Sequence, residues 1–211
     1  MKMPLTLLDH PLALHLVAHL RDVETEPESF RRYARTLTNM LVLEATRRMA
    51  TEGFTVQTPL AKAGGRRLSE RLAVVPVLRA GLGMLESAVE LFPHVSVGYI
   101  GLERHEGTAV ARSYYCKLPD LQGMYTLCLD PMLATGGSAS QAVSLIKAGG
   151  GIRITMVCVV AAPEGVARMT ADHPDVPIVA AALDERLDPR KYIVPGLGDF
   201  GDRLYGTGGG S

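Results

Sequence analysis

The sequence predicts an α/β protein: a mostly parallel, twisted sheet flanked by helices, with further helices at the N-terminus and a protruding β-hairpin. Two observations indicate the sheet. From about residue 71, short apolar runs alternate with helix-forming segments, and these runs are nearly continuous in Val, Leu, Ile and Ala, as in strands buried on both faces. A third observation, the polar segment 104–124 in the middle of this pattern, indicates the hairpin.

The first fifty residues have a helical pattern. Residues 25–28, Thr-Glu-Pro-Glu, resemble a capping box with a proline in the first turn of a helix. Apolar side chains then recur at helical spacing at Phe30, Tyr33, Ala34, Leu37, Met40 and Leu41. This wide apolar stripe faces either the core or a partner subunit.

The rest of the chain alternates between the two kinds of element. We expect strands at 72–78, 95–102, 126–129, 154–162 and 177–183, and helices at 83–92, 137–148 and 163–173. Such alternation is typical of βαβ units in one parallel sheet.

The segment 104–124 is the exception. It has Thr, Val and Tyr side chains in a loosely alternating pattern, which favours a hairpin or a long loop that protrudes from the sheet. Long loops in compact domains are usually functional. Tyr114 and Tyr115 therefore either close over a ligand or pack at a subunit interface.

Length and charge limit the function. The 211 residues suit one domain, 1–211, with a flexible tail from about 206 to 211. Lys plus Arg equals Asp plus Glu, at 22 each, so the broad positive field of a nucleic-acid-binding protein is missing. We expect no nucleic-acid partner, and a local site for any anion that binds.

The cysteines and the N-terminal segment indicate location. Cys116, Cys128 and Cys158 are too widely spaced for a disulfide framework or a zinc site. The first 22 residues contain two prolines and two aspartates, unlike a signal peptide or a membrane span. We expect a cytoplasmic protein without membrane contact.

Polar residues follow the predicted strands. Arg79 comes after 72–78, Arg104 after 95–102, and the segment 130–138 after 126–129. Because ligands of open parallel sheets bind outside the carboxyl ends of the strands, we expect these residues at one edge of the sheet.

The loop TLCLDPMLATGGSASQAV (126–143) indicates what binds there. Residues 135–138, Thr-Gly-Gly-Ser, lead into a helix whose first N–H groups lack intrahelical partners and whose dipole favours an anion. Asp130 repels phosphate but suits sugar hydroxyls, and two arginines suit a second, more highly charged group. The pattern predicts a ligand with a monophosphate, a sugar and a further polyanion.

Competing motifs fit poorly. No lysine follows Gly137, as a P-loop requires. The string GLGDFG (196–201) lies too near the C-terminus for a dinucleotide site. His15 and His19 share a helical i, i+4 spacing, but no glutamate lies between them and no third ligand follows, which disfavours a metal site.

Simpler interpretations of the single residues stay open. The two glycines 136 and 137 also suit a tight turn, Asp199 suits a turn cap, and Glu164 suits a helix start beside a proline. Taken singly, Arg79 and Arg104 fit the surface, but together, at two strand ends, they favour a site.

Four segments resemble uracil phosphoribosyltransferases. They are VPVLRAGLGM (75–84), DPMLATGGS (130–138), VAAPEG (160–165) and YIVPGLGDFGDR (192–203). The likeness extends from Phe30 to Tyr205. Many purine phosphoribosyltransferases have two adjacent acids at the start of the loop, whereas here Pro131 follows Asp130 directly, which favours the uracil branch.

The resemblance implies a phosphoribosyltransferase-type fold and a pentosyltransferase that moves ribose 5-phosphate from phosphoribosyl pyrophosphate (PRPP) to N1 of uracil, giving UMP and pyrophosphate. By analogy Asp199, Arg104 and Arg79 are catalytic, and Ile193, Gly198, Asp199 and Phe200 bind uracil. The residues that bind PRPP are then Arg79, Arg104, Asp130, Pro131, Met132, Leu133, Ala134, Thr135, Gly136, Gly137, Ser138 and Asp199.

The resemblance also implies partners. PRPP carries Mg²⁺ into the site, without direct side-chain ligands. GTP is an expected activator, although the stretch 58–72 is shorter than expected and leaves nucleotide activation open. We expect a homodimer or a larger homo-oligomer. Two other functions remain as alternatives: a regulatory protein that binds nucleotides to control RNA or transcription, and transfer to a purine base.

Overall fold

A computed structural model of the chain describes residues 5–104 and 111–207. The helices are α1 (Pro11–Arg21), α2 (Pro27–Ala45), α3 (Leu82–Leu91), α4 (Gly137–Ala148), α5 (Pro163–Asp172) and α6 (Phe200–Tyr205). The strands are β1 (Leu5–Leu7), β2 (Thr51–Gln57), β3 (Lys62–Leu68), β4 (Arg71–Leu78), β5 (Ser96–Val97), β6 (Tyr99–Arg104), β7 (Ala111–Lys117), β8 (Met124–Leu129), β9 (Met132–Leu133), β10 (Arg153–Ala161), β11 (Ile178–Leu183), β12 (Arg186–Leu187) and β13 (Ile193–Val194).

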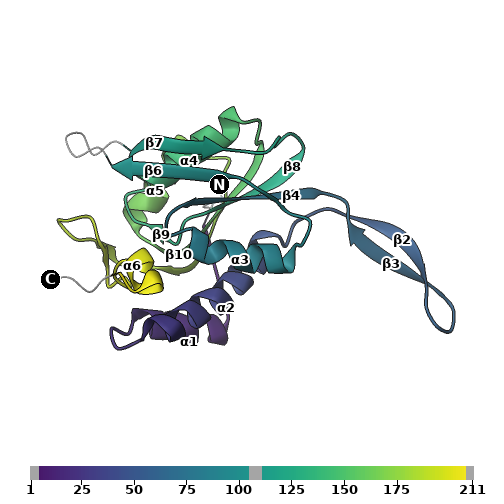
Figure 1. Ribbon diagram of the computed structural model, residues 1–211, viewed down its shortest axis with the longest axis horizontal. Coiled ribbons are helices and arrows are strands. Elements are labelled where there is room, and N and C mark those ends of the chain that lie inside the picture. Colours follow the sequence, from purple (N-terminus) through teal and green to yellow (C-terminus); the bar gives the residue numbers. More distant parts are fainter. Residues whose placement is uncertain (1–4, 105–110, 208–211) are drawn as a thin grey trace.

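Within the described part, nine strands form one central sheet. Its order is β1-β11-β10-β8-β4-β6-β7, with β5 beside β4 and β9 beside β10. Every pair is parallel except β6 and β7. The mostly parallel sheet predicted from the sequence is therefore confirmed (Figure 1).

Helices cover both faces of the sheet. Alternate residues of β8 point to opposite faces, so Leu127 and Leu129 pack with α1, α2, α3 and α6, whereas Cys128 packs with α4 and α5. Phe30 of α2 meets Phe200 of α6 edge-on, with ring centroids 5.2 Å apart. This contact joins the N-terminal helices to the C-terminal segment that carries part of the site. Among the described helices, none has the length and apolar character needed to cross a bilayer.

The N-terminal region is helical, with two corrections. The strand β1, which pairs with β11, precedes the helices and was not predicted. Pro27 is the first residue of α2, but the predicted capping box is wrong: Glu26 is the N-cap and its side chain makes no capping hydrogen bond. Thr25 Oγ1 instead donates to the carbonyl of His19 at 2.7 Å. The apolar stripe of α2 does face the core.

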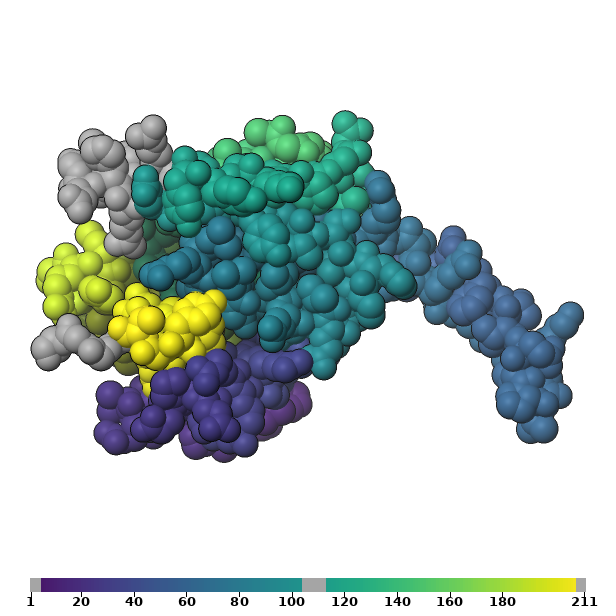
Figure 2. Space-filling model, in the orientation of Figure 1, coloured from purple at the N-terminus to yellow at the C-terminus, as the bar shows by residue number. Residues whose placement is uncertain are grey.

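Two hairpins differ in their relation to the sheet. The predicted hairpin exists, but its first strand, β6, ends at Arg104, where the segment 104–124 begins, and only β7 lies within that segment; both strands extend the sheet edge rather than protrude from the sheet. Its tip, 105–110, lies outside the described residues. The sequence analysis did not foresee the other hairpin, β2–β3, which projects far from the body (Figures 1 and 2). Its outermost apolar side chain, Leu60, is 96% exposed.

The C-terminal helix ends in an ordered turn. Gly206 is the C-cap of α6 with φ of 68°, and Thr207 bonds to Asp202 through its N–H and its hydroxyl. These contacts belong to the first two residues of the predicted flexible tail, whose flexibility stays a prediction. The remaining four, 208–211, lie outside the described part of the chain.

Candidate active site

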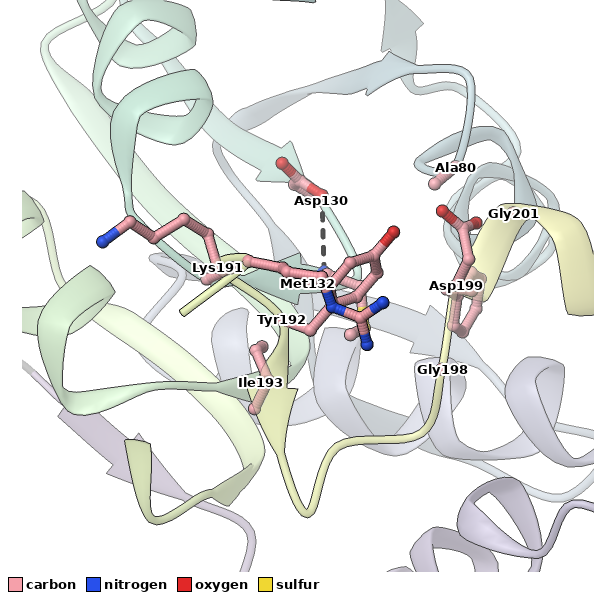
Figure 3. A pocket seen from close by; sticks show the side chains of 12 residues that line it. Ala80, Asp130, Met132, Lys191, Tyr192, Ile193, Gly198, Asp199 and Gly201 are labelled. Atoms are coloured by element: carbon pink, nitrogen blue, oxygen red, sulfur yellow. Dashed lines mark hydrogen bonds between the residues drawn. The ribbon is translucent and has the colours of Figure 1, made fainter. Parts of the chain in front are cut away.

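The ends of the sheet strands meet the C-terminal segment at one cavity of about 310 Å³ (Figure 3). It is lined by Ala80, Asp130, Met132, Ala134, Arg190, Lys191, Tyr192, Ile193, Gly198, Asp199, Phe200 and Gly201. Three segments that are far apart in the sequence thus face one space. This position, beyond the carboxyl ends of parallel strands, is the usual ligand site of such sheets.

A second hollow, of about 160 Å³, adjoins the first. It is lined by Asp130, Met132, Leu133, Ala134, Thr135, Gly136, Ser138 and Ala139. Three residues, Asp130, Met132 and Ala134, line both spaces. A ligand with two separate polar groups can therefore extend from one hollow into the other.

Backbone geometry shapes the loop 130–138, called the phosphate-type loop below because a phosphate is expected to bind there. Gly136 is the N-cap of α4 and has φ of 76°, a conformation that favours glycine. An added Cβ there would lie 2.8 Å from the carbonyl oxygen of Gly165. At Gly137 an added Cβ would meet only Thr135 Oγ1, at 3.7 Å. The N–H of Gly137 has only a long hydrogen bond, to Thr135 Oγ1 at 3.5 Å, and the first N–H groups of a helix lack intrahelical partners, which suits an anion.

Not every predicted loop residue can use its side chain. Leu133 is 1% exposed and belongs to the core, and Pro131 is buried while its carbonyl accepts from Val159 and Val160 at 2.9 and 3.1 Å. Pro131 and Gly137 line neither hollow. Any role of Pro131 in binding PRPP is therefore limited to shaping the loop, and Leu133 can contribute only its backbone.

Asp130 stands where the two hollows join. It follows β8, its N–H donates to the carbonyl of Val157 at 3.1 Å, and its Oδ1 accepts from Met132 N–H at 3.3 Å. Burial, with a smaller contribution from Asp130, raises the pKa of Cys128 and Cys158 far above the usual range. Both thiols therefore stay protonated core groups, as the sequence predicts.

Asp199 caps a helix and also lines the cavity. It is the N-cap of α6, where its Oδ1 accepts from Asp202 N–H at 2.9 Å, and it also lines the cavity beside Ala80 (Figure 3). The simpler interpretation, a cap, is correct as far as it goes. It does not exclude a contact with ligand, because only one carboxylate oxygen makes the capping bond.

The predicted uracil-binding residues lie together. Ile193, Gly198, Asp199 and Phe200 all line the first cavity. Ile193 is in β13, and the turn after it leads into α6. Their roles stay predictions, but the geometry permits one planar base to contact all of them.

The structure does not show either of the two predicted arginines at the cavity. Arg79 follows β4 through a cis peptide bond and does not line the cavity, although Ala80 does. Burial raises the pKa of the Tyr205 phenol, and the charge of Arg79 offsets part of that rise. Arg104 ends β6, and its side chain lies outside what the structure describes. The pyrophosphate role of both stays a prediction.

Sequence reasoning missed five residues that line the first cavity: Ala80, Arg190, Lys191, Tyr192 and Gly201. Arg190, Lys191 and Tyr192 lie in the short loop between β12 and β13 and face the first cavity. The available signal was weak: two adjacent cations directly before Tyr192, with no helix or glycine pattern around them. Nothing local indicates that this turn lies over Asp130.

The described residues include no group of three His, Cys, Asp or Glu side chains able to hold a metal ion. The two carboxylates that line the cavity, Asp130 and Asp199, are nevertheless of the oxygen type that Mg²⁺ prefers. The site therefore fits an ion that a phosphorylated ligand brings with it.

The fold and the two joined hollows define the class of the protein as a phosphoribosyltransferase-type α/β protein. A solved hypoxanthine phosphoribosyltransferase from Staphylococcus aureus has the same fold at 11% identity, with a TM-score of 0.51 over 87% of this chain and 91% of that one. A solved protein from Aquifex aeolicus is far more similar, at 40% identity and a TM-score of 0.90 over 95% and 97% of the two chains.

The family follows from the sequence comparisons. The family model described as uracil phosphoribosyltransferase matches residues 7–207. A curated uracil phosphoribosyltransferase from Thermus thermophilus is 50% identical over 97% of this chain and 100% of its own length. The chain belongs to the uracil phosphoribosyltransferase family, which confirms the resemblance found in its motifs.

Proposed function

We propose that the chain transfers ribose 5-phosphate from PRPP to N1 of uracil, forming UMP and pyrophosphate, as a step of pyrimidine salvage. One observation carries the proposal: in a chain of this family, the loop 130–138 and the segment 193–200 border the same cavity. The first suits the phosphoribosyl group and the second suits the base.

The phosphoribosyl group is bound by the loop. Backbone N–H groups and the hydroxyls of residues 135–138 hold the 5-phosphate at the start of α4. Asp130, which lines both hollows, accepts hydrogen bonds from ribose hydroxyls. This arrangement places C1 of the ribose in the larger cavity.

The base is held by the opposite wall. Backbone groups near Ile193 and Gly198–Phe200 read the edge of uracil, and Asp199 lies close to the reacting centre. Positive charge develops on the sugar as the bond to pyrophosphate breaks, as in glycoside hydrolysis. Orientation of N1 in line with that bond accounts for a large part of the acceleration.

The leaving group needs compensation for its charge. Arg79 and Arg104 receive the pyrophosphate. A Mg²⁺ ion bound together with PRPP would neutralise part of the pyrophosphate charge. Asp199 is the carboxylate that we expect next to the magnesium-bound substrate.

An assay with several bases tests the proposal. Purified protein with PRPP and Mg²⁺ should release pyrophosphate with uracil, and not with hypoxanthine or guanine. Turnover with a purine and none with uracil would overturn the substrate assignment. Removal of Mg²⁺ with a chelator should abolish turnover. A titration with RNA over a range of salt tests the regulatory alternative, since a phosphate-binding regulator loses affinity steeply as salt rises.

Regulation and assembly complete the proposal. GTP acts as an activator, and a separate cavity of about 580 Å³ supports a polyanion site because Arg31, Arg32 and Arg35 line it. Arg32→Ala should weaken activation by GTP without changing basal turnover.

The exposed apolar side chains Leu14, on α1, and Leu60, on the β2–β3 hairpin, support a homodimer, which light scattering can test. The cytoplasmic location and the single domain stay predictions from the sequence.

A further inference from the structure

Lys191 has an unusual backbone conformation. Its φ is 71°, and it is the one non-glycine residue with positive φ in the described part of the chain. Lysine is disfavoured in this left-handed region. Strained residues of this kind cluster at ligand-binding sites, where the surrounding structure holds them in place.

The turn around Lys191 fixes that conformation. Its N–H donates to the carbonyl of Asp188 at 2.9 Å, and Asp188 N–H donates to the carbonyl of Tyr192 at 2.8 Å. The N–H of Tyr192 donates to Asp188 Oδ1, also at 2.8 Å. The turn therefore holds Lys191 against its own preference, on the wall of the first cavity.

Lys191 lies on the side of the cavity that borders the phosphate-type loop. In Figure 3 it and Asp199 lie on opposite sides of Asp130. The pKa of Glu164, at the start of α5, is lowered, first by the hydrogen bond from Leu187 N–H and least by the charge of Lys191.

The start of α5 in turn packs on the loop. Gly165 is so close that an added Cβ would lie 2.5 Å from the carbonyl oxygen of Ala134. Ala134 lines both hollows. Lys191 lines the first cavity together with Asp130 and Ala134, which also line the hollow of residues 130–139.

That smaller hollow is short of positive charge. None of the described residues that line it is a lysine or arginine, and one of them, Asp130, is acidic. A phosphate monoester bound there would rest on backbone N–H groups and hydroxyls, because Arg168, whose stem lies within 3.2 Å of an added Cβ at Gly136, already pairs with Asp172. The neighbouring cation, Arg190, is already engaged: its guanidinium lies 3.6 Å from Asp188 and stacks over Tyr192.

We propose that Lys191 is a phosphate-binding residue whose ammonium pairs with the 5-phosphate of the phosphoribosyl ligand, in PRPP and in UMP alike. The proposal rests on the proposed function for the identity of the ligand. The proposal explains the strained backbone of Lys191: the turn directs the flexible lysine side chain toward an anion whose charge the loop 130–138 alone does not neutralise.

Three substitutions separate charge from strain. Lys191→Met removes the charge and keeps the backbone strain, Lys191→Gly removes both, and Lys191→Arg keeps the charge. Lys62→Met, on the exposed β2–β3 hairpin, is the matched control. For each variant we would measure the KM for PRPP and for uracil, the Kd for UMP, ribose 5-phosphate and pyrophosphate, and the Tm.

Charge-assisted contacts set the expected size of the effect. Lys191→Met should raise the PRPP KM and the Kd of UMP and ribose 5-phosphate by roughly tenfold, less so at high salt. The Kd of pyrophosphate and the KM of uracil should not change. Lys191→Gly should bind as weakly as Lys191→Met but melt at least as high as the parent, since glycine tolerates this φ. Lys191→Arg and Lys62→Met should bind like the parent.

Other outcomes would overturn the inference. Parent-like binding of ribose 5-phosphate by Lys191→Met would exclude Lys191 from the phosphate. Weaker binding of pyrophosphate, with UMP unaffected, would place the lysine at the leaving group instead. Because ribose 5-phosphate binding is measured without turnover, it tests Lys191 even if the parent forms no UMP, a result that would reject the proposed function separately.

Discussion

The two walls of the active cavity are held in place in different ways. The loop 130–138 is fixed by neighbours: β9 pairs with β10, and the turn at Gly136 leads directly into α4. The wall formed by 188–200 depends on residues more than 160 positions away in the sequence. The first wall is held mainly by its own backbone geometry, and the second is held mainly by tertiary contacts.

An ion pair anchors the second wall. The side chain of Asp184 is 1% exposed and pairs with Arg21 at the end of α1 through two hydrogen bonds. Asp184 also accepts from Gly196 N–H at 2.9 Å, and Arg21 donates to the Gly196 carbonyl at 2.8 Å. The turn before Gly198 is thus fixed by Arg21 and Asp184, which do not line the cavity themselves.

A second arginine repeats this arrangement. Arg203 of α6 donates to the carbonyls of Leu20, Asp22 and Leu197, and its guanidinium lies over the ring of Phe30, 4.6 Å from the centroid. The N-terminal helices therefore position the predicted base-binding residues although no residue of α1 or α2 lines the cavity. The following predictions disturb one wall at a time.

The largest effect is expected from Asp184→Ala. It leaves the guanidinium of Arg21 and the N–H of Gly196 without their partner, and loss of one member of a buried pair typically costs about 3–5 kcal/mol. The free energy of unfolding from urea denaturation should fall by that amount, and the uracil KM should rise more than the PRPP KM. Glu90→Ala breaks the exposed Arg35–Glu90 pair and should cost under about 1 kcal/mol. Equal losses in the two variants would contradict the anchoring role.

Gly137→Val tests the first wall. The space beside Gly137 is open to within 3.7 Å, so the chain should fold, but we expect the branched side chain to crowd a phosphate held at the neighbouring residues Gly136 and Ser138, which line the smaller hollow. The PRPP KM should rise by about a hundredfold or more, as when several charge-assisted bonds are lost. Gly53→Val is the control, because an added Cβ at Gly53 also meets nothing within 4 Å. Unchanged PRPP affinity in a folded Gly137→Val protein would show that residues 135–138 do not hold the phosphate of PRPP.

Asp199→Asn separates capping from chemistry. Asparagine caps helices as well as aspartate, so the Tm should change little. Loss of the negative charge at the reacting centre should lower kcat on the order of tenfold to a hundredfold. Asp202→Asn, an acid of the same helix that does not line the cavity, should retain kcat. Full activity of Asp199→Asn would remove Asp199 from the mechanism.

The smallest effect concerns the support behind the phosphate-type loop. Asp172 of α5 accepts from Ser140 Oγ, in the first turn of α4, at 2.6 Å. Arg168 first, and then Ser140, hold the pKa of Asp172 below its usual range. Because the folded pKa lies below the unfolded one, this contribution to stability is complete above the unfolded pKa and is lost as pH falls through the folded pKa.

The pH dependence of melting checks this prediction. The Tm difference between the parent and Asp172→Asn should be constant near neutral pH and should shrink as pH falls below the usual range of aspartate. Asp120→Asn, at an exposed aspartate in the turn before β8, is the control and should differ little from the parent at any pH. A Tm difference for Asp172→Asn that is independent of pH would show that the carboxylate charge contributes nothing.

The same contrast explains what the sequence could predict. The span of α4, 137–148, was predicted correctly because Gly-Gly-Ser before an apolar periodic segment is a local signal. The strands β4, β8, β10 and β11 were found from apolar runs, within one or two residues at each end. Asp130 follows from its place after β8, and its position at the sheet edge follows from topology alone.

The second wall had no such signal. Arg21 and Asp184 are both unremarkable in sequence, and their pairing depends on how α1 packs against the sheet. The cavity lining by Arg190, Lys191 and Tyr192 depends on a turn that Asp188 closes. The β2–β3 hairpin was missed because its exposed strands lack the apolar pattern of a buried sheet.

We propose that backbone N–H groups of residues 135–138 enclose the 5-phosphate while the base lies against residues 193–200. A crystal structure of the protein soaked with UMP tests it directly. We predict the phosphate at the first turn of α4 and the uracil ring between Ile193 and Phe200. A phosphate bound elsewhere, or a base outside this cavity, would contradict the account.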